Sequence, residues 1–163
     1  MHINKQALKL IKEIPNYGKI PALRYKKVKG KSWRVLSDYV RMRDFILYGK
    51  CIASGKTIMD WRSVDAGHYE SMGGNGVLCG FSDINVHAQA KDSNGWGGMA
   101  EGARYKEGLI LRYGNEILDE IEILKRSTAK DDAFFHIDKI HDTLGKFQQL
   151  KKDYPHFNYP EYL

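Results

Sequence analysis

The stretches DAGHY (residues 65–69) and NVHAQAKDSN (residues 85–94) decide how the middle of this chain is interpreted. They place an acid, two histidines and two asparagines among several glycines, with little apolar periodicity. A packed hydrophobic core does not need such residues, because polar side chains are costly to bury without partners. The pattern therefore indicates a small irregular hairpin, expected over residues 51–81, that carries a chemical site.

The composition predicts one folded domain with extensions. The chain has 163 residues, of which 42% are hydrophobic and 28% are charged. No apolar run approaches the roughly 18 residues that a transmembrane helix needs. The N-terminus is interrupted by Lys9, Lys12 and Glu13 and does not resemble a secretory signal. We therefore expect a cytoplasmic protein without a membrane partner.

The charge distribution favours a polyanionic partner. The formal net charge is +6, and positive residues are concentrated between Lys19 and Lys50. Such a basic end suggests polyanion binding, although a solubilising surface is an equally weighted alternative interpretation. The two cysteines, Cys51 and Cys79, are too few for a disulfide scaffold or an all-cysteine zinc site, and we expect both to be reduced.

Helices are expected on both sides of the hairpin. A short helix is expected over residues 5–13, followed by a basic arm, and Ser32 can cap a helix that ends near Tyr48. Extended pieces are expected at residues 57–61, 64–69 and 77–81. A further helix should begin after Asn85, break at the glycine loop 95–98, and resume over residues 99–113.

Two more helices should follow in the last third of the chain. Asn115 can cap the first, and Asp131 or Asp132 opens a long helix that Pro155 ends, before an extended tail. The apolar stripe of the long helix indicates a core or helix–helix contact, with dimerisation as a further use. Its residues are Phe134, Ile137, Ile140 or His141, Leu144, Phe147 and Leu150.

A histidine on a hairpin, followed by asparagines, is suited to phosphodiester hydrolysis. That reaction needs a base that activates water and a cation that neutralises charge on the phosphate. Neutral imidazole can serve as the base, because its unperturbed pKa is about 6.5. Carboxylate and amide oxygens are the ligands that Mg²⁺ prefers.

The sequence resembles the HNH, or ββα-metal, endonucleases, and within them the phage recombination endonucleases called NinG or Rap. The resemblance spans residues 31–114 and rests on KSWRVLSDYVRMRD, YGKCIASGK, WRSVDAGHYES, NVHAQAKDSN and RYKEGLILRYG. It implies that His68 is the general base and that Asn85 supports the base region. It also implies that Asn94, at the last motif position, is a ligand for Mg²⁺ or Mn²⁺.

The acidic metal ligand is expected to be Asp65, with Glu101 as a second candidate. Many such enzymes carry the acid directly before the base, where this chain has Gly67. Asp65 lies two residues before Gly67 and, in a regular strand, faces the same side. His87 matches the family segment, and its role is left open between capping, packing and phosphate binding.

DNA is the expected partner, either as duplex or as a branched recombination intermediate such as a Holliday junction. Basic residues expected to contact its phosphates are Lys26, Lys27, Lys29, Lys31, Arg34, Arg41, Arg62 and Lys91. A homodimer paired through the C-terminal helix is expected, since two strands must be cut about a symmetric branch. The alternative function is a DNA-binding recombination accessory protein whose nuclease site has decayed.

The resemblance also leads to an expectation about zinc. Relatives often carry two CxxC pairs, an arrangement suited to structural zinc. The corresponding residues here are Cys51, Ser54, Ala90 and Ser93, and neither serine nor alanine replaces a thiolate. We expect no structural zinc, with packing from Trp61, Trp96 and the helices in its place.

The expected fold class is α+β, with a ββα-metal (HNH) core and a small irregular hairpin, flanked by N-terminal and long C-terminal helices. Residues 1–31 are expected to form a basic arm, 32–114 the nuclease core, and 115–163 a helical extension. The resemblance implies a phage-encoded protein acting in the cytoplasm of a bacterial host.

Overall fold

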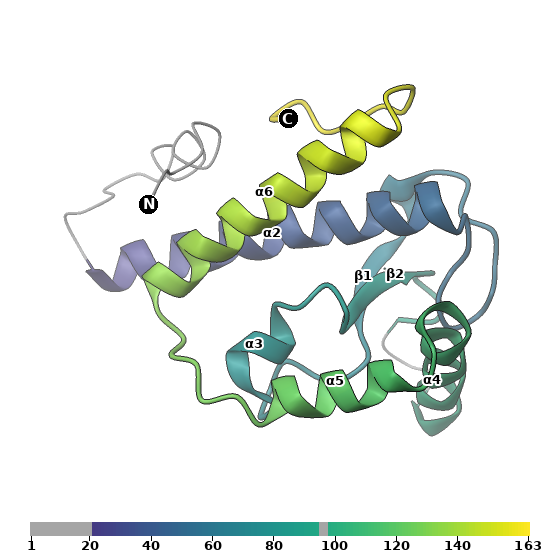
Figure 1. Cartoon of the computed structure of the whole chain (residues 1–163), viewed down its shortest axis with the longest axis horizontal. Helices are drawn as coiled ribbons and strands as arrows, with labels where there is room; N and C mark the ends of the chain where they lie inside the picture. Colours follow the sequence, from purple (N-terminus) through teal and green to yellow (C-terminus); the bar gives the residue numbers. More distant parts are fainter. Residues whose placement is uncertain (1–20, 95–97) are drawn as a thin grey trace. The chain divides into compact units, whose positions relative to one another are not determined.

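The computed structural model describes residues 21–94 and 98–163 (Figure 1). The helix expected over residues 5–13, and Trp96, lie outside these ranges. Helices together with a two-stranded antiparallel sheet confirm the α+β class. The elements are α2 (Pro21–Leu47), the short 3-10 helix η1 (Trp61–Ser63), β1 (Asp65–His68), α3 (Gly76–Gly80), β2 (Val86–Gln89), α4 (Gly98–Tyr113), α5 (Glu116–Lys125) and α6 (Ala133–Asp153).

The described residues fall into two compact units. The helical unit consists of residues 21–39 and 130–163, and the sheet unit of residues 40–129. These boundaries differ from the three parts expected from the sequence, because α2 runs through residue 31 and α5 packs with α3 and α4. Within the described ranges, no helix combines the length and the apolar character that crossing a membrane requires.

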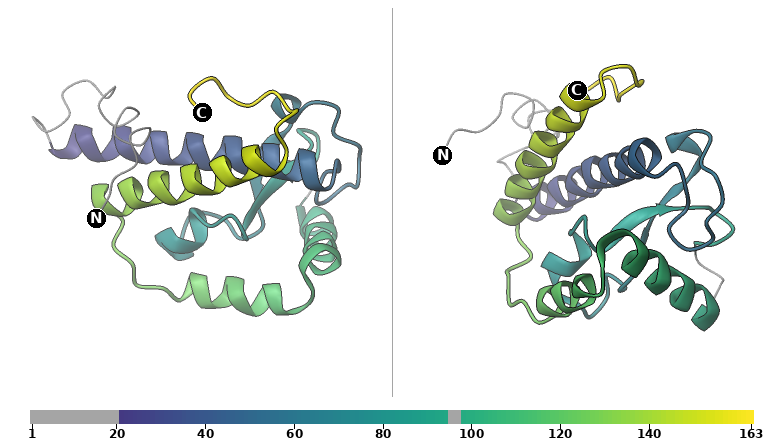
Figure 2. Two further views of the ribbon diagram at one scale, coloured as in Figure 1. Left: turned by 45° about the horizontal axis from the view of Figure 1, so that its top comes forward. Right: turned by 45° about the vertical axis from the view of Figure 1, so that its right-hand side comes forward.

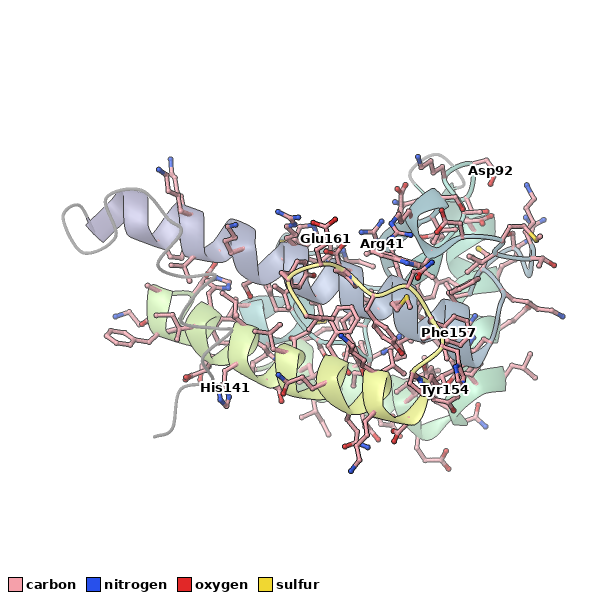
Figure 3. All side chains as sticks on the ribbon, turned by 90° about the horizontal axis from the view of Figure 1, so that it is seen from above. Arg41, Asp92, His141, Tyr154, Phe157 and Glu161 are labelled. Atoms are coloured by element: carbon pink, nitrogen blue, oxygen red, sulfur yellow. The ribbon has the colours of Figure 1, made fainter. Side chains whose placement is uncertain are left out.

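The helical unit is held together by apolar contacts between α2 and α6, which lie side by side (Figure 1). Val28 and Val35 of α2 pack with Ile140 and Leu144 of α6, and none of the four is more than 1% exposed. The stripe of the long helix therefore serves as core within one chain. Ile140 and His141 were alternatives for one position of the stripe. Ile140 is buried, whereas His141 is exposed and projects from α6 (Figure 3).

Phe134 does not belong to this stripe, because its side chain is 72% exposed. Asp132 caps α6, accepting hydrogen bonds from the backbone N–H groups of Phe134 and Phe135. The tail after α6 folds back within the same unit instead of simply extending. Tyr162 donates a 2.7 Å hydrogen bond to Asp38, and Leu163 packs against the apolar cluster.

The expected start of α2 at Ser32 is wrong, because the helix begins at Pro21. Proline is tolerated in a first turn, and a glycine such as Gly30 costs only about 1 kcal/mol inside a helix. Burial of Val28 on α6 offsets that cost. Ser32 is itself buried inside the helix and does not cap it. The lysines of the expected arm are therefore displayed on a helix.

The sheet unit contains a hairpin that was only partly predicted. The extended piece at residues 64–69 is confirmed as β1, but the helix expected after Asn85 is wrong, because β2 occupies Val86–Gln89. The two strands lie side by side (Figure 2). They pair antiparallel, with Asp65 opposite Gln89 and His68 opposite Val86. All four β2 residues are buried, although the apolar Val86 and Ala88 alternate with the polar His87 and Gln89.

Two further extended pieces were also predicted wrongly. Residues 77–81 lie mostly in the short helix α3. Residues 57–61 provide one isolated bridge, between Thr57 and Lys50, and then enter η1. Both segments are short, and periodicity does not separate strand from helix over so few residues.

The helices α4 and α5 were predicted more closely. α4 ends at Tyr113, as expected, where Gly114 adopts a positive φ of 86°. Its residues Tyr105 and Leu109 are buried in a cluster that includes Ile117 and Ile121 of α5. Asn115 precedes α5 but makes no side-chain capping hydrogen bond, so that detail was wrong.

Candidate active site

His68 is the last residue of β1, and its imidazole is oriented by a backbone carbonyl. Nε2 lies 2.9 Å from the oxygen of Gly80. Because a carbonyl only accepts, the proton is on Nε2 and the lone pair is on Nδ1. Burial lowers the pKa of His68 below its ordinary value, outweighing the opposite effect of the Gly80 hydrogen bond. The ring is therefore neutral at pH 7, with Nδ1 as the basic atom.

Asn85 braces the segment that connects β1 to β2. Its Oδ1 accepts a 2.8 Å hydrogen bond from the N–H of Glu70, and its Nδ2 donates to the carbonyls of Glu70 and Cys79 at 3.0 Å each. The side chain is fully buried. It does not cap a helix. Its contacts suit the supporting role expected from the sequence, since they hold the backbone that follows His68.

The structure brings Asp65 and Asn94 together. Nδ2 of Asn94, in the turn after β2, donates a 3.2 Å hydrogen bond to Oδ2 of Asp65, in the first position of β1. Neighbouring oxygen ligands of an octahedral Mg²⁺ ion lie about 3 Å apart, given metal–oxygen distances of about 2.1 Å. The contact places the two side chains beside each other, and Oδ1 of Asn94, in place of Nδ2, would be the atom that binds such an ion together with Asp65.

Gly67 explains why no acid stands directly before His68. A methyl carbon added at Gly67 would overlap Oε1 of Gln89, which lies on the neighbouring strand. Gln89 is itself held by a 2.7 Å hydrogen bond from Nε2 to the carbonyl of Ser93. A side chain at position 67 would have to displace Gln89. Asp65, two residues earlier, accordingly stays the acidic candidate on β1.

Asp65 and His68 belong to opposite faces of the hairpin. The register pairs Asp65 with Gln89 and His68 with Val86, and side chains alternate along a strand. Three residues of strand span about 10 Å. The base and the nearest ligand pair are thus separated along β1.

Glu101, the second acidic candidate, lies in the first turn of α4. Its Oε2 accepts a 3.3 Å hydrogen bond from Arg104. Its Oε1 is buried and has no hydrogen-bond partner among the described residues. A buried carboxylate oxygen without a partner is costly, and a cation would satisfy it. Glu101 therefore stays beside Asp65 as a candidate ligand.

The ligand set offered by the described residues is small and consists of hard oxygens. No group of three or more histidine, cysteine, aspartate or glutamate side chains converges there to hold a metal. Mg²⁺ often takes one or two protein carboxylates and keeps several waters. The pair of Asp65 and Asn94 fits that ion, whereas a closed four-ligand zinc site requires a different set.

His87 is fully buried and acts in packing. Arg43 donates a 2.8 Å hydrogen bond to its Nδ1, and its Nε2 donates to the carbonyl of Ile84 at 3.1 Å. Burial lowers the pKa of His87, which favours this neutral form. The ring lies against Tyr105 and Tyr113. An imidazole with no exposed surface does not reach a DNA phosphate.

Asp44 is a buried structural hub that sequence reasoning missed. Its carboxylate accepts from Nε of Arg43 at 2.8 Å, from the N–H of Ala88 at 2.8 Å, and from Nη1 of Arg112 at 3.1 Å. Burial alone would raise its pKa, but Arg43 holds it well below its usual range. Neighbouring charges along a helix are usually solvated, so no sequence signal marks Asp44 as buried.

The four positions of the expected zinc motif lie in two turns that contact each other. Sγ of Cys51 accepts hydrogen bonds from the N–H groups of Ser54 at 3.4 Å and Ala90 at 3.2 Å. Cys79 is a separate, fully buried residue, and burial raises the pKa of its thiol to about 11. Of the four positions at which relatives often carry zinc-binding cysteines, this chain thus has a thiol at Cys51 alone. The absence of zinc stays a prediction.

The basic residues expected to bind DNA occur in both units. In the helical unit, Lys26 is exposed, whereas Lys29 forms a 2.6 Å ion pair with Asp131. The remaining residues of this group are Lys27 and Lys31, both half-buried, and Arg34, whose guanidinium lies 5.7 Å from the ring centre of Tyr162.

In the sheet unit, Arg41 and Arg62 both stack on Trp61, with the guanidinium carbons 5.2 Å and 4.5 Å from the centre of its ring. Arg41 also donates to the carbonyl of Val64, directly before β1. Trp61 is only 6% exposed. Lys91 is exposed in the turn that carries Asn94.

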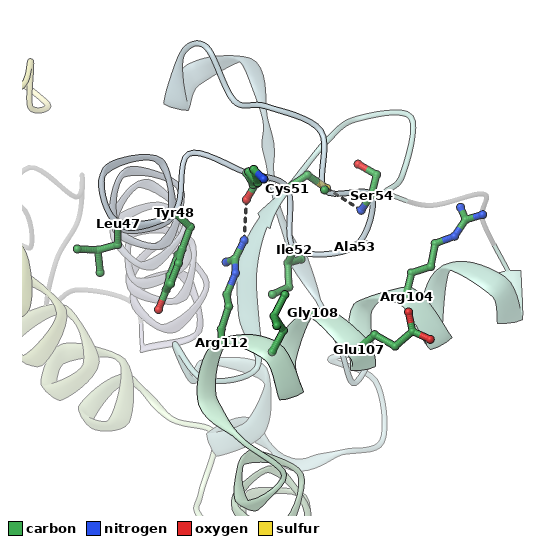
Figure 4. Close-up of a pocket in the computed structure, with 13 residues that line it drawn as sticks. Leu47, Tyr48, Cys51, Ile52, Ala53, Ser54, Arg104, Glu107, Gly108 and Arg112 are labelled. Carbon is green, nitrogen blue, oxygen red and sulfur yellow. Dashed lines mark hydrogen bonds between the residues drawn. The ribbon is translucent and has the colours of Figure 1, made fainter.

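A pocket of about 650 Å³ lies between residues 47–55 and α4 (Figure 4). Arg112 crosses it, donating a 2.6 Å hydrogen bond to the carbonyl of Lys50. None of the residues expected to act in catalysis or metal binding lines this pocket. The chemistry is therefore assigned to the hairpin and not to the pocket.

Comparison with known proteins gave one match. A family model described as bacteriophage lambda NinG protein matches residues 17–154, which is well over half of the chain and includes the hairpin with its flanking helices. No curated protein and no solved structure matches the chain.

Proposed function

Because the chain belongs to the family of the bacteriophage lambda NinG protein, we propose that it is a metal-dependent DNA endonuclease that acts in phage recombination. The observation that carries the proposal is the contact of Asp65 with Asn94 on the hairpin that holds His68. The order of β1, β2 and α4 supports an HNH, or ββα-metal, core. Branched DNA of the Holliday-junction type is the proposed substrate.

His68 acts as the general base. Its Nδ1 takes a proton from a water molecule, whose oxygen attacks phosphorus opposite the departing 3′ oxygen. The Gly80 carbonyl accepts from Nε2 and so stabilises the imidazolium that forms. The bond from phosphorus to the 3′ oxygen breaks, and that oxygen then gains a proton. The products carry a 5′ phosphate and a 3′ hydroxyl.

Asp65 and Asn94 would hold Mg²⁺ or Mn²⁺, with Glu101 as an additional candidate. Such a cation supplies neutralisation of charge on the phosphate and on the departing oxygen. The two side chains bring one negative charge and one neutral amide oxygen, which suits a weakly held ion that also binds substrate. The scissile phosphate must reach both the ligand pair and His68, which belong to opposite faces of the hairpin and are about 10 Å apart along β1.

The alternative is a DNA-binding accessory protein with a decayed site. It is favoured by the lack, among the residues that the structure describes, of three clustered acidic, histidine or cysteine side chains. The hydrogen bonds of His68, Asn85 and Asn94 favour a working site instead, because decay would not preserve them together.

Cleavage assays with His68→Ala test the proposal. The substrates are a labelled four-way junction, a linear duplex and single strands, each with Mg²⁺ and with chelator. Loss of the base should lower the cleavage rate by about 10²- to 10⁴-fold and leave DNA affinity nearly unchanged. His141→Ala is the matched control, since His141 is exposed on α6. Normal cutting by a folded His68→Ala protein would remove His68 from the mechanism.

Metal titrations separate the acidic candidates. Asp65→Ala and Asn94→Ala should each raise the Mg²⁺ concentration needed for half-maximal cleavage. If only Glu101→Ala does so, Glu101 is the ligand. Chelator should abolish cleavage while leaving the thermal midpoint nearly unchanged. Stoichiometric zinc by elemental analysis, or unfolding on chelation, would contradict the expected lack of a structural zinc site.

A further inference from the structure

The turn that carries Asn94 is supported by a second turn, residues 50–57. This second turn is closed by the bridge between Lys50 and Thr57 and by a 2.8 Å hydrogen bond from the N–H of Cys51 to the carbonyl of Lys56. The N–H of Ile52 donates to the carbonyl of Ala88 in β2 at 3.1 Å. The supporting turn is therefore attached to the strand that leads into residues 90–94.

Cys51 provides the first contact between the two turns. Its buried sulfur accepts one hydrogen bond from Ser54 in its own turn (Figure 4) and another from Ala90 in the Asn94 turn. Burial raises the pKa of the Cys51 thiol, but hydrogen bonds from Ser54, Ala90 and Ala53 outweigh burial and lower it. The sulfur thus accepts hydrogen bonds from two backbone segments.

Lys56 provides the second contact, through an ion pair with Asp92. Asp92 precedes Asn94 by two residues and lies at the surface (Figure 3). The two side chains are 60% and 62% exposed, so the pair is screened by water and contributes modestly. Together with the sulfur contact, it anchors the Asn94 turn at two points.

We infer that Cys51 and Lys56 are positioning residues, which fix the turn at residues 90–94 so that Asn94 meets Asp65. The hydrogen bonds inside that turn, such as the 2.9 Å bond from the N–H of Ser93 to the carbonyl of Ala90, set its local shape only. Its orientation towards β1 depends on contacts from outside. The importance of this positioning for cleavage rests on the proposed function, whereas its effect on the turn does not.

Hydrogen exchange measured by mass spectrometry tests the effect on the turn. In Lys56→Met, amides of residues 88–94 should exchange a few-fold faster, and in Cys51→Ala about tenfold faster, while those of α6 are unchanged. Lys106→Met is the charge-matched control, because Lys106 is exposed on α4. The swap of Lys56→Asp with Asp92→Lys should restore protection. Unchanged exchange in Lys56→Met would overturn the inference, even if Cys51→Ala fails to fold.

The metal requirement of cleavage tests the link to Asn94. Lys56→Met should raise the Mg²⁺ concentration for half-maximal cleavage a few-fold without lowering the rate at saturating Mg²⁺, and Lys106→Met should not. Faster exchange with an unchanged Mg²⁺ requirement would overturn the assignment of Lys56 as a positioning residue for the site. If the natural protein does not cleave DNA, the proposed function fails, and the exchange result alone decides whether the two residues hold the turn.

Discussion

The helical unit and the sheet unit both contain apolar clusters, but the sheet unit adds a buried ionic network. Between α2 and α6 the central contact is aliphatic, with Val28 and Leu144 as typical members. In the sheet unit, the carboxylate of Asp44 lies at the centre of a buried ionic network with Arg43 and Arg112. Both interiors are buried, but the contact between α2 and α6 depends on apolar packing, whereas the network around Asp44 depends on hydrogen bonds and ion pairs.

The difference indicates which unit can hold a catalytic site. Apolar packing is non-directional, and cores accept many residues of similar volume. A buried hydrogen-bonded network accepts few alternatives, because each unpaired polar atom is costly. In the sheet unit such a network holds β2 through Ala88, and Asn85 holds the connection to β1. This hydrogen-bonded network therefore supports the hairpin that carries His68 and Asp65.

The strongest test of this comparison is removal of the central carboxylate. Asp44→Ala removes the buried carboxylate that Arg43 and Arg112 share and should lower the free energy of unfolding by about 3–5 kcal/mol. Asp142→Ala removes a carboxylate that pairs with Lys139 and Lys146 on the surface of α6 and should change it by no more than about 0.5 kcal/mol. Urea denaturation measures both. Equal losses of unfolding free energy in the two variants would contradict the importance of the buried network around Asp44.

The next test concerns the apolar interior of the helical unit. Leu144→Ala should cost about 2–5 kcal/mol, because the residue is fully buried against α2. Phe134→Ala, on the same helix but 72% exposed, should cost much less. Denaturation at two protein concentrations is the measurement. A cost for Leu144→Ala that appears only at high concentration would mean that the stripe is a dimer contact, as first expected from the sequence.

A third test uses pH to separate the two histidines of the hairpin by their roles. Cleavage requires unprotonated His68, so it should be full above the pKa of His68 and fall about tenfold per pH unit below it. Because burial lowers that pKa, the acidic midpoint should lie below 6.5. A midpoint above 6.5 would contradict the burial of the base in the free enzyme.

His87 should make the stability of the fold depend on pH in the same direction as cleavage, with a loss at acidic pH. The pKa of His87 is lower in the folded chain than in the unfolded chain, so the unfolded chain binds protons first as the pH falls. The free energy of unfolding should therefore decrease as the pH drops below about 6.5.

The smallest expected effect concerns the surface of the helical unit. Replacement of Lys26 and Lys27 by glutamine should make the dependence of log affinity on log salt shallower by about 1.8, if each contacts one phosphate. Lys29→Gln should instead lower the thermal midpoint, because Lys29 pairs with Asp131. Binding to duplex DNA at several salt concentrations is the measurement. An unchanged slope would assign Lys26 and Lys27 to a solvated surface.

Local patterns predicted much of the helical structure. The 3.6-residue stripe predicted α6, and the helix ends expected near Tyr48 and at residue 113 agree with the observed ends of α2 and α4. The start of α2 was missed because tertiary burial of Val28 outweighed the glycine and proline signals. The strand β2 was missed because its alternation of apolar and polar residues extends over only four residues, too few to separate a strand from a helix.

For the candidate site, the sequence by itself determined the chemical types and their order along the chain: a carboxylate at Asp65, an imidazole at His68 and an amide at Asn94. Only the tertiary structure decided which of them meet, since Asp65 and Asn94 come together through the pairing of β1 with β2 and the supporting turn at residues 50–57. It also decided that His87 is enclosed by Arg43. The physical reason is that propensity acts over neighbouring residues, whereas burial and hydrogen-bond partners depend on segments distant along the chain.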